Sequence, residues 1–110
     1  MNGDTKTRAV IKKLVQRLVA GYAPEKIILF GSYAYGRPDA DSDIDLLIIK
    51  ATRERFFDRL DTVRRVTTGT HPHIPFEPIV LTPKEVERRV KAGDQFLSEI
   101  LQKGEVLYAA

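Results

Sequence analysis

The sequence contains no cysteine and no long apolar run. Without cysteine the chain forms no disulfide and offers no thiolate to a metal, which fits a reducing compartment. A membrane-spanning helix needs about eighteen or more consecutive apolar residues, and no segment reaches that length. The first ten residues also lack the apolar stretch of a secretory signal. We therefore expect a cytoplasmic protein that does not enter the membrane.

The chain also carries only a small excess of positive over negative charge. The formal net charge is +3, and 43% of the residues are hydrophobic and 30% charged, as in an ordinary globular domain. This balance permits binding of nucleic acid but lacks the dense basic patch of a dedicated nucleic-acid binder. Repeats and low-complexity segments are absent. A chain of 110 residues can build one core but not two, so we expect a single domain over residues 1–110.

Hydrophobic periodicity predicts helices that alternate with short strands. In chain order we expect a helix over 5–21, a strand over 26–30, a short helix over 32–36, a strand over 43–49 and a helix over 53–67. A strand over 74–81 follows, then a helix from the capping box Thr82-Pro83-Lys84-Glu85 to about Lys91, and a last helix from Gly93-Asp94 through Gln102. Prolines at 75 and 78 place the third strand at a sheet edge, or interrupt it. The fold class is α/β (α+β), a small mixed sheet flanked by helices.

The turn Gly31-Ser32 lies between a buried strand and a short helix. Backbone N–H groups at a helix start have no intrahelical partner and favour negative charge. Glycine lets a phosphate approach closely, and the Ser32 hydroxyl adds a donor. The pair predicts a phosphate site. Taken alone, without the aspartates that follow, the pair would more often be a plain strand-turn-helix junction.

Two aspartates follow ten residues later. Asp43 and Asp45 are two apart in the next strand and would therefore face the same way. Because aspartate is disfavoured in strands, the pair indicates a hard cation such as Mg²⁺. The alternative is that both lie in the preceding loop and only shape a turn.

Glu77 in the third predicted strand is the candidate for a third carboxylate. If that strand pairs beside the second, Glu77 would share a cleft with Asp43 and Asp45. Two ions about 4 Å apart would then clamp the attacking and leaving oxygens of a phosphoryl displacement. The alternative is a solvent-facing glutamate on an edge strand.

With Gly31-Ser32, ten residues and Asp43-x-Asp45, the chain resembles the minimal nucleotidyltransferases of the DNA polymerase beta-like superfamily. The resemblance implies that fold, with Asp43, Asp45 and Glu77 as catalytic ligands of two Mg²⁺ ions. It also implies that Gly31 and Ser32 hold the phosphates of ATP or another nucleoside triphosphate.

The chain departs from this family at two positions. The third carboxylate is usually aspartate, whereas here it is Glu77, followed by Pro78. Many relatives carry arginine directly after the Gly-Ser pair, where this chain has Tyr33, so we expect Arg37 to supply the charge. Both departures bear on catalysis more than on the fold.

The resemblance further implies a reaction partner. Minimal nucleotidyltransferases often pair with a HEPN-domain toxin and act as its antitoxin, in some cases by adenylylating it. The chain is short for an acceptor domain of its own, so we expect the acceptor hydroxyl on such a partner or across a homodimer. The alternatives are a weakly active or inactive subunit that binds partner and nucleotide, and a transferase acting on RNA ends or a small molecule.

Other polar and aromatic residues have plainer interpretations. His71 and His73 cannot complete a zinc site without further ligands, so we expect a turn there. Tyr33 and Tyr35 would stack on a base or accept a nucleotide, but packing is the commoner role. The arginines at 53, 55, 59, 64 and 65 predict a solvated helix face.

Overall fold

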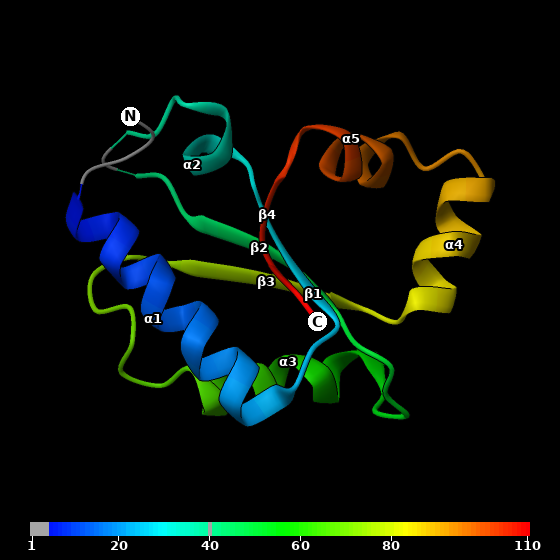
Figure 1. Ribbon diagram of the computed structural model, residues 1–110, viewed down its shortest axis with the longest axis horizontal. Coiled ribbons are helices and arrows are strands. Elements are labelled where there is room, and N and C mark those ends of the chain that lie inside the picture. Colours follow the sequence, from blue (N-terminus) through cyan, green and yellow to red (C-terminus); the bar gives the residue numbers. More distant parts are fainter. Residues whose placement is uncertain (1–4, 40) are drawn as a thin grey trace.

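A four-stranded sheet with helices on both faces organises the computed structural model, which describes residues 5–39 and 41–110 (Figure 1). The strands are β1 (Lys26–Phe30), β2 (Ile44–Ile49), β3 (Phe76–Leu81) and β4 (Glu105–Ala109), in the order β3-β2-β1-β4. The helices are α1 (Thr5–Tyr22), α2 (Ser32–Tyr35), α3 (Phe56–Val66), α4 (Pro83–Lys91) and α5 (Gln95–Lys103). The predicted class, a small mixed sheet flanked by helices, is confirmed.

The direction of the strands makes the sheet mixed. β1 runs antiparallel to both β2 and β4, whereas β2 and β3 are parallel. A parallel pair cannot be joined by a tight turn, and here α3 lies in the crossover between β2 and β3. The third strand lies at a sheet edge, as its prolines predicted, because an edge position tolerates a missing backbone donor.

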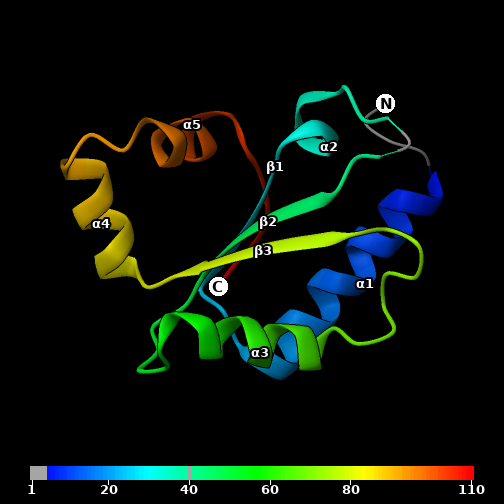
Figure 2. The same cartoon turned by 180° about the vertical axis from the view of Figure 1, so that it is seen from behind.

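Side chains that alternate along the strands feed two apolar clusters. Helices α1 and α3 cover one face, where α1 contributes Ile11, Leu14, Leu18 and Tyr22 and α3 contributes Val63. Helix α5 covers part of the other face with Leu97 and Ile100. Figure 2 shows the same division from behind, with α4 and α5 on one side of the sheet and α1 and α3 on the other. None of the described helices is long and apolar enough to cross a membrane.

Several predicted boundaries differ from the structure by one to three residues, and three of the differences concern the start of an element near the site or of α3. β2 begins at Ile44, so Asp43 lies just before the strand. β3 begins at Phe76, because residues up to 74 form a turn. α3 begins at Phe56, since Glu54 binds the hydroxyls of Tyr22 and Thr62 and stays outside the helix.

The sequence-based order omitted β4. Gly104 caps the end of α5, and the next five residues, Glu105–Ala109, lie at the second sheet edge, where they pair antiparallel with β1. This strand is short, its residues are exposed or half-buried, and the β1–β4 register shifts between Ile27 and Ile28. A local pattern of alternating burial is therefore weak, and long-range pairing defines the strand.

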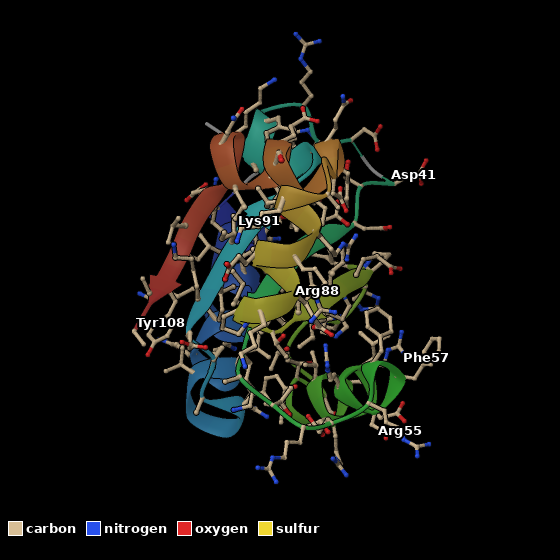
Figure 3. The ribbon with its side chains drawn as sticks, turned by 90° about the vertical axis from the view of Figure 1, so that its right-hand side faces the viewer. Asp41, Arg55, Phe57, Arg88, Lys91 and Tyr108 are labelled. Carbon is tan, nitrogen blue, oxygen red and sulfur yellow. The ribbon has the colours of Figure 1, made fainter. Side chains whose placement is uncertain are left out.

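Arg59 corrects the prediction of a solvated arginine face on α3. Its side chain is buried and binds Glu85 of α4 through both terminal nitrogens, at 2.6 and 3.3 Å. Nη1 also donates to the backbone carbonyl of Val80 at 3.2 Å. Glu85 completes the predicted capping box with Thr82 as well. Arg59 therefore ties α3 to the start of α4, whereas Arg55 projects into solvent near Phe57 (Figure 3).

Candidate functional site

The turn after β1 has a backbone conformation that only glycine adopts readily. Gly31 has φ +75° and ψ −158°. A Cβ atom at this position would collide with the carboxylate of Asp45. The local sequence therefore needs glycine for two reasons, the dihedral angles and the close approach of an acidic side chain.

Helix α2 follows Gly31 directly and consists of about one helical turn. The backbone N–H groups of Ala34 and Tyr35 both donate to the Gly31 carbonyl at 3.0 Å. Ser32 and Tyr33 begin the helix, where backbone N–H groups have no intrahelical acceptor. Such donors suit a phosphate oxygen.

Asp45 and Glu77 are brought together by the pairing of β2 and β3. The two residues are direct partners in the parallel register, so their side chains lie on the same face of the sheet. Asp45 is also the register partner of Phe30, the last residue of β1. The sequence-based condition, that the third strand pairs beside the second, is fulfilled.

The acidic side chains act on one another. Burial, together with the smaller effect of the negative charges of Asp43 and Glu77, raises the pKa of Asp45 to about 6. Within residues 5–39 and 41–110, no salt bridge compensates Asp45. A bound cation would relieve the repulsion among these carboxylates.

The donor set fits Mg²⁺ chemically, because carboxylate oxygens are ligands that this hard cation prefers. As the side chains lie, however, no three histidine or acidic groups in the described part of the chain converge at metal-binding distances. Glu77 is exposed and Asp43 half-buried. Rotamer changes at these two residues would be needed to close the site.

The other predicted site residues lie around the turn. Ser32 is half-buried at the start of α2. Arg37 follows α2, is exposed, and donates its backbone N–H to the Ser32 carbonyl at 3.0 Å. Among the described residues its side chain forms no ion pair, and the structure does not direct it to the carboxylates.

Two tyrosines and two histidines were weighed as further candidates. Tyr33 is buried in the cluster under α1, so the packing interpretation is correct for it, whereas Tyr35 is exposed. His71 and His73 lie in the turn before β3, as predicted. The ring nitrogen Nδ1 of His71 is 3.0 Å from the Ile74 carbonyl.

Phe96 is a residue near the site that the sequence did not indicate. Its ring meets that of Phe30 edge to face, with centroids 5.8 Å apart. Phe96 is 66 positions beyond Phe30 in the sequence, and α5 must fold back over β1 to create this contact. Local periodicity carries no information about such a contact.

Comparison with known proteins identifies the family of the chain. The nucleotidyltransferase domain family matches residues 9–107, so the chain belongs to this family. Its general activity is the transfer of nucleotidyl groups, and the chain is a transferase of this kind.

A solved structure supports the same fold. A candidate nucleotidyltransferase from Sulfolobus solfataricus is 27% identical to this chain, with a TM-score of 0.53. The alignment covers 78% of this chain and 81% of that protein. A comparison with curated proteins gives no match. The assignment to the minimal nucleotidyltransferases in particular stays a prediction.

Proposed function

We propose that the chain is a Mg²⁺-dependent nucleotidyltransferase that moves a nucleoside monophosphate, AMP in the first instance, from a nucleoside triphosphate to an acceptor hydroxyl. The observation that carries this proposal is the β2–β3 register, which sets Glu77 beside Asp45. Gly31 lies directly against Asp45, so the phosphate turn and the carboxylates form one site.

Each part of the site has a distinct role in the reaction. Asp43, Asp45 and Glu77 hold the metal, and Gly31 with Ser32 holds the β- and γ-phosphates. Mg²⁺ held by these carboxylates would supply positive charge to the phosphate oxygens. The acceptor oxygen bonds to the α-phosphorus, the bond from that phosphorus to the bridging oxygen breaks, and pyrophosphate leaves. Glu77 takes the acceptor proton, and Arg37 turns toward the leaving phosphates.

The acceptor is proposed to be a hydroxyl of a partner protein, with a HEPN-domain toxin as the first candidate and this chain as its antitoxin. Support for this partner comes from the resemblance to minimal nucleotidyltransferases. A homodimer that presents the acceptor is the second arrangement. In either case the chain supplies the triphosphate half of the reaction.

Intact-mass analysis of the chain with its partner, ATP and Mg²⁺ tests this function. We expect the partner to gain the mass of one AMP, and Asp43→Asn with Asp45→Asn to slow the gain by about 10³-fold or more, because charge stabilisation dominates such reactions. The matched control is Asp58→Asn with Asp61→Asn, two exposed acids on α3. The control should modify the partner at the wild-type rate.

The same experiment can contradict the proposal. Absence of any nucleotide-sized gain on either protein would remove the transferase function with this partner. A gain that survives the double asparagine variant would show that these aspartates are not the metal ligands.

A second candidate function is a nucleotide-binding subunit that binds its partner without transferring. The open arrangement of the described acidic side chains, with Glu77 exposed, favours this candidate. It predicts Mg²⁺ and ATP binding by the complex with no mass gain, so the same samples separate the two functions.

A further inference from the structure

Phe96 is an exposed aromatic residue on a helix that is otherwise well anchored. About half of its surface is open, at 53% relative exposure, whereas the adjacent Leu97 is buried. The Asp94 side chain caps α5 by accepting from the Leu97 N–H at 2.9 Å, and it also binds Arg89. The capped start of α5 therefore holds Phe96 in a defined position, where about half of the side chain remains exposed to solvent.

The position of Phe96 relates it to the acidic site. Its ring contacts Phe30, and Phe30 is the cross-strand partner of Asp45 and the residue before Gly31. Cross-strand partners have Cβ atoms about 5 Å apart, so Phe96 lies on the order of 10 Å from the carboxylates. Figure 1 and Figure 2 both show α5 and α2 at the same end of the sheet, near the end of β1.

A nucleoside triphosphate has its own fixed spacing. The base is joined to the α-phosphate through one ribose, so a molecule with its phosphates at Gly31 must place its base beside the site. An open aromatic ring on that side offers a surface on which a base can stack, with a favourable contribution that does not depend on hydrogen bonding.

We propose that Phe96 is the platform on which the base of the bound nucleoside triphosphate stacks. This inference rests on the proposed function, since it requires a triphosphate at Gly31. Purines overlap an aromatic ring more fully than pyrimidines do, so the platform favours purine triphosphates. The competing role, contact with a partner protein, predicts that nucleotide binding by the isolated chain does not depend on Phe96.

Equilibrium binding to ATP and to inorganic tripolyphosphate, each with Mg²⁺, tests this inference. Tripolyphosphate has the phosphates without the base. Phe96→Ala should weaken ATP binding about tenfold and leave tripolyphosphate binding unchanged. Phe96→Tyr should keep ATP binding, whereas Phe96→Leu, which retains apolar bulk against Phe30, should lose it as alanine does.

Phe57 provides the matched control. It is also an exposed phenylalanine in edge-to-face contact with a neighbour, Phe56. Figure 3 shows it on α3, well below Asp41, which lies in the loop leading into β2. Phe57→Ala should bind both ligands as the wild type does.

The outcomes separate this inference from the function on which it rests. Unchanged ATP binding in Phe96→Ala and Phe96→Leu overturns the inference alone. Equal losses for ATP and tripolyphosphate also overturn it, because the residue would then shape the phosphate site. A wild-type chain that binds neither ligand overturns the proposed function and the inference together.

Discussion

The two faces of the sheet differ in how completely helices cover them. Helices α1 and α3 cover one face, whose cluster joins buried leucines and isoleucines of α1, β1 and β2 to Val63 of α3 and Val80 of β3. The other face is only partly covered, by α5 and by Val86 of α4, and no residue of α4 is buried. Asp45 and Glu77 lie on this second face, in line with Leu47 and Ile79 of the same strands.

This difference shows how one small sheet combines stability with reactivity. Burial of apolar area supplies most of the folding free energy, so the covered face can hold the domain together. The open face can then tolerate acidic groups whose mutual repulsion is unfavourable until a cation or proton arrives. Substitutions on the covered face should therefore change mainly stability, and substitutions of the acidic residues on the other face should change mainly chemistry.

The largest expected effect on stability comes from the covered face. Leu14→Ala removes a fully buried side chain of α1 and should lower the free energy of unfolding by about 3 kcal/mol. Val86→Ala, a half-buried position at which α4 packs on the other face, should cost about 1 kcal/mol or less. Urea unfolding of both variants makes the comparison. Equal losses would mean that the two faces contribute alike.

A smaller effect on stability is expected at Gly31, the turn residue that contacts Asp45 on the partly covered face. Gly31→Ala combines a positive φ with a collision against Asp45, and should cost about 2 kcal/mol or more. Gly93→Ala has a similar φ of +87° with no atom nearby, and should cost about 1 kcal/mol. Thermal unfolding measures both.

A double-mutant cycle can isolate the contribution of the collision between position 31 and the Asp45 carboxylate. In an Asp45→Ala background, Gly31→Ala should cost less than it does in the wild type, because the colliding carboxylate is gone and only the backbone strain remains. An undiminished cost in that background would assign the whole effect to the backbone.

The smallest expected effect is the pH dependence of the open face. The pKa of Asp45 is raised from its ordinary value to about 6, so its ionised form destabilises the folded state at higher pH. Asp45→Asn should raise the free energy of unfolding by about 1 kcal/mol at pH 8, a value reduced because solvent screens this half-buried group. The gain should shrink as pH falls through 6 and vanish below about 4.

Asp61→Asn serves as the control for this pH series. Asp61 is exposed on α3, and its replacement should change stability by less than about 0.5 kcal/mol at either end of the series. Denaturant titrations from pH 4 to pH 8 without divalent metal are the measurement. A stability gain for Asp45→Asn that is constant over this range would contradict the raised pKa.

Local pattern predicted most of the helices and strands of this protein. The apolar spacing of α1, the strand Lys26–Phe30 and the capping box at Thr82 are all properties of neighbouring residues, and the structure confirms them. Sequence also put Gly31 and the two aspartates in one short stretch, because the turn and the next strand are adjacent in the chain.

The tertiary structure alone decided which distant residues meet. The β2–β3 register placed Glu77 at Asp45 instead of one residue away, where its side chain would have faced the opposite side of the sheet. The burial of Arg59, the pairing of β4 and the contact of Phe96 with Phe30 have the same origin. Each depends on how elements far apart in sequence pack, and hydrophobic periodicity within one element cannot specify its partner.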